Sequence, residues 1–85
     1  MRFMLTFTWK QPPGDEVMAL MPAEQARTKE LMDQGIAEPA EMAADRSTLW
    51  AVWNCASQDE VEKTLQTLPM YEYLNTDITA LGADE

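Results

Sequence analysis

The sequence contains no histidine and a single cysteine, Cys55, among its 85 residues. An intramolecular disulfide is therefore impossible, and the Cys/His spacings of zinc sites are absent. Positive charge is also sparse, because 6 Lys and Arg stand against 15 Asp and Glu, for a net charge of −9. Such an excess of negative charge repels a phosphate backbone, so we expect no nucleic-acid partner.

Long hydrophobic runs are missing as well. The apolar stretch over residues 1–9 is short and interrupted by threonines, so it predicts neither a signal peptide nor a membrane span. We expect no membrane partner, and one thiol without an export signal predicts a cytoplasmic protein. With 46% hydrophobic residues, the chain is predicted to form one domain over residues 1–81, followed by a disordered tail at 82–85.

A domain of this size has few ways to gain stability. It buries only about 60% of its unfolded surface, and small domains usually add disulfides, a metal or a partner subunit. The composition removes the first two of these, so oligomerisation is left. We therefore expect a homo-oligomer, either a dimer or a larger ring of dimers, with no metal site.

Apolar periodicity, turn residues and caps divide the chain into strands and helices. The predicted elements are, in chain order, a strand over 2–9, a helix over 15–34 with a break before Pro22, a weak strand over 36–44, a strand over 48–56, a helix over 58–67 and a last strand within 70–81. The helix after Ser57 is predicted from the Ser-x-x-Glu spacing of a capping box. Pro39 makes the second strand an edge strand or a bulged one.

The order β-α-β-β-α-β is that of the ferredoxin-like fold, an α+β fold with a four-stranded antiparallel sheet and two helices on one face. The strand over 48–56 carries Trp50 and Trp53 at opposite parity, so large apolar side chains are expected on both faces of the sheet. Helices cover only one face. We predict that a second copy covers the other, giving a dimeric α+β barrel.

The second half of the chain carries the most specific pattern. Residues 67–74 read Thr-Leu-Pro-Met-Tyr-Glu-Tyr-Leu, and they follow a hairpin, an aromatic strand and a short helix that begins at a serine. In this order, and in the Leu-Pro stretch above all, residues 36–81 resemble the muconolactone isomerase family. Glu72 stands where the family signature has a proline.

The resemblance implies a small, cofactor-free oligomeric enzyme that moves a proton within an unsaturated lactone carrying a carboxylate. Such chemistry needs a base, an acid to return the proton, and a cation or hydrogen-bond donor for the negative charge of the substrate. Because histidine is missing, the base must be a carboxylate, a tyrosinate, a lysine or the Cys55 thiolate.

Two carboxylates of the predicted second strand, Glu38 and Glu41, are candidate catalytic bases. A carboxylate in an apolar cleft has its pKa raised toward a useful value, although glutamates on an edge strand are commonly solvated. Three positions apart on a strand, the two side chains are predicted to point to opposite faces, so only one of them would line a pocket. Tyr73 is the third catalytic candidate, because its hydroxyl can donate to a developing enolate.

Three further residues are candidates for substrate binding. Arg46, in the predicted hairpin turn, is either a bidentate clamp for a carboxylate or a solvent-facing cation. Trp53 and Tyr71 are either walls for a flat unsaturated ring or core packing.

Three functions stay open at this point. The first is an isomerase-like or cyclase-like enzyme that acts on a small unsaturated ring, and the second is a cofactor-independent monooxygenase of the same barrel superfamily. The third is a non-catalytic oligomeric module that binds a small molecule or a protein, which the missing histidine and the acidic second strand favour. A buried carboxylate beside aromatic side chains would favour catalysis.

Overall fold

Strand β1 (Arg2–Trp9) lies in the middle of a four-stranded sheet in the computed structural model, which describes residues 1–82. The strand order is β2-β3-β1-β4, and β1 pairs antiparallel with both β3 (Thr48–Asn54) and β4 (Leu74–Ala80). The edge strand β2 (Glu41–Met42) pairs antiparallel with β3. Apart from Gly82, the tail predicted at 82–85 lies outside the described residues.

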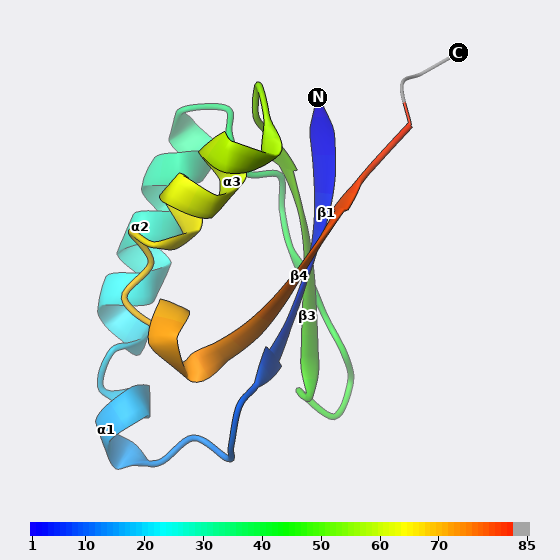
Figure 1. Cartoon of the computed structure of the whole chain (residues 1–85). Helices are drawn as coiled ribbons and strands as arrows, with labels where there is room; N and C mark the ends of the chain where they lie inside the picture. The colour runs from blue at the N-terminus through cyan, green and yellow to red at the C-terminus, as the bar shows by residue number, and fades with distance from the viewer. Residues whose placement is uncertain (83–85) are drawn as a thin grey trace.

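The helices lie on one face of this sheet (Figure 1). They are α1 (Asp15–Met18), α2 (Met21–Asp33) and α3 (Gln58–Leu65), with a short 3₁₀ helix, η1 (Tyr71–Tyr73), before β4. This arrangement confirms the predicted ferredoxin-like order. No helix within residues 1–82 is long and apolar enough to span a membrane.

Local sequence explains the helix limits. Pro22 occupies the first turn of α2, where its missing N–H removes no intrahelical bond. Ser57 caps α3, and its hydroxyl accepts a hydrogen bond from the backbone N–H of Glu60 at 3.3 Å. Both features follow the predicted pattern, and the observed helices end within two residues of the predicted limits.

The core fills the space between sheet and helices. Alternate positions of β1 and β3 point into it, and α2 and α3 contribute the apolar side chains on the opposite side. The buried set includes Phe3, Leu5, Phe7, Ala51, Trp53, Leu31, Val61 and Leu65. Burial of this kind is the main source of stability in a chain without disulfides.

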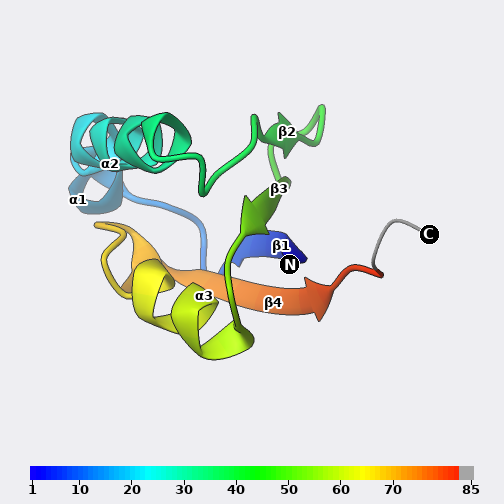
Figure 2. The same ribbon diagram turned by 90° about the horizontal axis from the view of Figure 1, so that it is seen from above.

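The other face of the sheet has no helix against it within the described residues (Figure 2, from above). Trp50 lies on this face and is 40% exposed, whereas Trp53 in the core is 4% exposed. The prediction that the two tryptophans lie on opposite faces is confirmed. Met4 and Val52, which pair across β1 and β3, lie on the Trp50 face and are half-buried. Cover by a second copy stays a prediction.

The second strand is shorter than predicted. Instead of spanning 36–44 it consists of Glu41–Met42, preceded by an isolated bridge between Ala37 and Trp53. Pro39 has no N–H for the ladder and separates the two pairings. The strand alternation is lost there, so the prediction that Glu38 and Glu41 point to opposite faces is wrong. Both lie on the Trp50 face, Glu41 opposite Trp50 and Glu38 beside Asn54.

Candidate functional site

A cleft of about 120 Å³ lies on the helix side of the sheet, where β1 ends and α2 begins. Its wall is made by four separate parts of the chain: the end of β1, the start of α2, the β2–β3 hairpin and the segment around Met70. The apolar part of the wall includes Phe7, Trp9, Met21, Leu49, Met70 and Leu74. An engineered apolar cavity of about 150 Å³ binds benzene, so this cleft is of the size that takes one small ring.

Glu24 places a carboxylate in this apolar wall. The residue is half-buried in the first turn of α2, and its Oε1 accepts a hydrogen bond from the backbone N–H of Met70 at 3.0 Å. Burial raises the pKa of the Glu24 carboxyl, and the hydrogen bond from Met70 acts in the opposite direction. A carboxyl held in one position with a raised pKa has the properties of a general base.

Among the described residues, Arg46 is the other charged residue that lines the cleft, and it is exposed. It lies in the β2–β3 turn with a left-handed φ of 64°, and its backbone N–H donates to the carbonyl of Ala43 at 2.8 Å. Oδ1 of Asp45 accepts from both the backbone N–H and the hydroxyl of Ser47, at 3.0 and 2.7 Å. These bonds fix the turn that positions Arg46 at the cleft.

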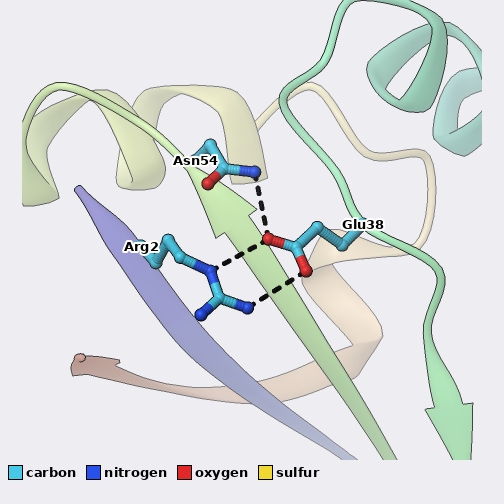
Figure 3. Close-up of polar contacts among 3 residues, drawn as sticks. All are labelled: Arg2, Glu38 and Asn54. Carbon is cyan, nitrogen blue, oxygen red and sulfur yellow. Dashed lines mark hydrogen bonds and ion pairs between the residues drawn. The ribbon is translucent and has the colours of Figure 1, made fainter. Parts of the chain in front are cut away.

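The other carboxylate of interest, Glu38, lies on the opposite face of the sheet. Arg2 donates to both of its oxygens, from Nε to Oε2 at 3.0 Å and from Nη2 to Oε1 at 3.1 Å (Figure 3). Asn54 adds a bond from Nδ2 to Oε2 at 3.2 Å. The hydrogen bond from Arg2 is the main reason why the pKa of Glu38 lies below its ordinary value.

The remaining predicted site residues are dispersed. Glu41 is exposed on the Trp50 face, and Trp53 is buried in the core. Tyr73 lines a second hollow of about 240 Å³, and Tyr71 is exposed. Of the six predicted residues, the structure therefore places Arg46 alone in the wall of the cleft. The roles assigned to the others stay predictions.

Glu24 was not among the residues predicted from the sequence. One signal could have found it: Glu24 precedes Leu31 by seven residues, which is two helical turns, and Leu31 is fully buried. A glutamate at a core-facing position of a helix is unusual and indicates a partly buried carboxylate. Within residues 1–82, no cluster of three or more His, Cys, Asp or Glu side chains could hold a metal ion.

Comparisons with known proteins agree on the fold. The family model for muconolactone delta-isomerase matches residues 1–84. A crystal structure of muconolactone isomerase superposes with a TM-score of 0.83 at 21% sequence identity, over 99% of this chain and 91% of that one. A search of curated protein sequences finds no match.

A second solved structure has the same architecture. It is 5-chloro-2-hydroxyhydroquinone dehydrochlorinase from Burkholderia phenoliruptrix AC1100, in complex with 2,5-dihydroxybenzoquinone. The TM-score is 0.68 at 12% identity, over 96% of this chain and 95% of that one. At these identities the two structures show a shared fold and leave the reaction to be argued from the residues.

Proposed function

Because this chain belongs to the muconolactone delta-isomerase family, we propose that it is a small enzyme that shifts a proton, and with it a double bond, within an unsaturated lactone or related small ring. The observation that supports this proposal most strongly is the half-buried Glu24 carboxylate in an apolar cleft of single-ring size. Proton transfer at carbon needs a base of raised pKa beside the ring of the substrate, and this cleft combines such a carboxylate with space for one ring.

In the proposed reaction Glu24 takes the acidic proton from a saturated ring carbon next to a double bond that is conjugated with the lactone carbonyl. The electron pair of the broken C–H bond moves into the ring and produces a dienolate. Glu24, now protonated, returns the proton to a different carbon of the same ring, so the double bond changes place and no atom is gained or lost. The Met70 N–H holds the carboxyl in position for both steps.

Arg46 is proposed to bind the carboxylate of the substrate. Its guanidinium can form two parallel hydrogen bonds with a carboxylate, which fixes the orientation of the ring as well as its position. This interaction also opposes the net charge of −9, which would otherwise disfavour an anionic substrate. Glu24 and Arg46 thus supply the base and the anchor from two different elements.

We also propose that the chain works as a homo-oligomer in which the Trp50 face of one copy packs on that of another. Support comes from the exposed indole of Trp50 and from the half-buried Met4 and Val52 on the same face. A two-fold pairing of identical sheets would bury these side chains without a further domain. The cytoplasm stays the predicted compartment.

A non-catalytic binding module is the second candidate. The specific observation in its favour is that Glu38 and Glu41, the two acidic residues expected to provide the base, both lie away from the cleft. Under this interpretation the cleft binds a ring and Glu24 performs no chemistry. One experiment separates the two candidates.

The test is turnover of muconolactone followed by ultraviolet absorbance, with deuterium incorporation from heavy water as a second readout. Glu24→Gln keeps the size of the side chain and its hydrogen-bond acceptor but removes the base, so we expect a loss of about 100-fold or more in kcat. Glu41→Gln is the matched control, because Glu41 is exposed on the other face. Equal turnover by the Glu24→Gln and Glu41→Gln proteins would remove Glu24 as the base, whereas neither turnover nor exchange by the folded wild type would favour the binding module.

A further inference from the structure

Trp9, the last residue of β1, lies at the wall of both hollows. It pairs with Leu74 of β4 on the helix side of the sheet and is half-buried. The cleft that contains Glu24 lies against Trp9, and so does the second hollow. Among the described residues that line the two hollows, Trp9 alone lines both.

The two hollows differ in size and in chemistry. The cleft measures about 120 Å³, whereas the second hollow measures about 240 Å³ and is lined in part by residues of the loop that leads into α1. The cleft is mostly apolar. The second hollow has Lys10, Glu16, Glu72 and Tyr73 in its wall. A ligand that reached from one into the other would thus combine a ring in the cleft with a second ring and a polar end beyond Trp9.

We propose that Trp9 is a specificity-determining residue whose indole separates the two hollows and restricts the cleft to single-ring ligands. The proposal rests on the proposed function only in taking the cleft as the substrate site. A shorter side chain at position 9 joins the two hollows, so that a ligand with two fused rings can place its second ring where the indole was. The apolar area that this ring buries then increases affinity.

The test measures binding rather than turnover. Isothermal titration calorimetry gives the dissociation constants of benzoate and of 2-naphthoate, which share a carboxylate and differ by one fused ring. The ratio of the naphthoate constant to the benzoate constant is compared in the wild type, Trp9→Ala and Trp9→Leu. Trp50→Leu is the matched control, because it makes the same change on the opposite face of the sheet. All the proteins are compared at a concentration at which analytical ultracentrifugation gives them the same oligomeric state.

We expect the ratio to fall about tenfold in Trp9→Ala and by a smaller factor in Trp9→Leu, and to stay at the wild-type value in Trp50→Leu. If Trp9→Ala does not fold by circular dichroism, Trp9→Leu decides. An unchanged ratio in the folded Trp9 variants overturns the proposal, as does an equal fall in Trp50→Leu or a lack of binding by either ligand to any of the proteins.

Failure of the proposed function would look different. A wild-type protein without turnover or deuterium exchange, whose binding ratio nevertheless falls in the Trp9 variants, contradicts the isomerase and supports the role of Trp9. Turnover by the wild type together with an unchanged binding ratio in the Trp9 variants supports the isomerase and contradicts the role proposed for Trp9.

Discussion

Two glutamates on the two sides of the same sheet show how surroundings determine what a carboxylate can do. Glu24 is half-buried in an apolar wall and held by one backbone N–H, and burial raises its pKa. Glu38 lies on the other face and accepts from Arg2 and Asn54, which lower its pKa. The first environment favours the uptake of a proton, and the second favours a permanent negative charge. The cleft is therefore suited to chemistry and the Arg2–Glu38–Asn54 cluster to structure.

The two tryptophans of β3 contribute very differently to stability, because they lie on opposite faces of the sheet. Trp53→Ala removes a buried indole from the core and is expected to lower the free energy of unfolding by about 3–5 kcal/mol. Trp50→Ala removes an indole that is 40% exposed, so its effect on the isolated chain should be much smaller. Urea denaturation at low protein concentration measures both. A similar loss in the two variants would contradict the assignment of the core to the helix side.

Trp50→Ala is also expected to change the oligomeric state of the protein. If the Trp50 face packs on a second copy, the variant should dissociate at concentrations at which the wild type is still oligomeric. Analytical ultracentrifugation over a range of concentrations measures this. An unchanged oligomer in a folded Trp50→Ala protein would remove this face as the interface.

Arg46 in the cleft and Arg2 on the other face of the sheet should differ in their effect on substrate binding. Arg46→Ala removes the proposed anchor, and losing a charge-assisted pair is expected to lower kcat/KM for a carboxylated substrate by about 10- to 100-fold, mostly through KM. Arg46→Lys keeps the charge without the bidentate geometry, so its kcat/KM should lie between those of the wild type and of Arg46→Ala. Arg2→Ala is the control on the other face and should leave KM close to the wild-type value. A KM raised equally by the Arg2 and Arg46 variants would contradict the assignment of the cleft.

The smallest expected effect concerns pH and stability. The raised pKa of Glu24 means that the folded chain holds this proton more tightly than the unfolded chain, so Glu24 favours folding increasingly as the pH falls toward about 4. The lowered pKa of Glu38 has the opposite sign, because its stabilising contribution is present at neutral pH and is lost on acidification through its folded pKa.

Thermal unfolding between neutral and acidic pH tests these signs. The unfolding temperature of Glu24→Gln, relative to that of the wild type, should be higher at neutral pH than in acid. The relative unfolding temperature of Glu38→Gln should be lower at neutral pH than in acid. Each difference should shrink as the pH falls. If the relative unfolding temperatures of the two variants changed with pH in the same direction, the opposite pKa shifts of Glu24 and Glu38 would be contradicted.

The sequence predicted the fold well because its strongest signals are local. The alternation in residues 2–9, the serine cap of α3 and the proline in the first turn of α2 each depend on neighbours in the chain. The second strand was predicted too long, because the pairing of an edge strand that contains Pro39 depends on β3 rather than on its own residues. Local pattern does not contain that information.

The site was harder to predict, because four distant parts of the chain form the cleft. Arg46 could be found, since a turn between two strands presents its side chains at the end of a sheet. Glu24 was missed because the apolar stripe of α2 is weak, and a weak stripe does not show which side of the helix faces the core. Leu31 is the residue of α2 that the structure buries. The spacing from Leu31 places Glu24 on the core-facing side of α2, but the hydrogen bond of Glu24 with the segment around Met70 is a tertiary contact that the spacing does not predict.

The most direct measurement of the contrast between the two faces is a carbon-detected NMR titration of the glutamate side-chain carboxyls, with and without benzoate. We expect Glu24 to titrate above its ordinary pKa and Glu38 below it, and benzoate to shift the Glu24 resonance and leave that of Glu38 in place. A Glu24 pKa at or below that of Glu38, or a benzoate response at Glu38 and none at Glu24, would contradict the assignment of the cleft carboxylate as the base.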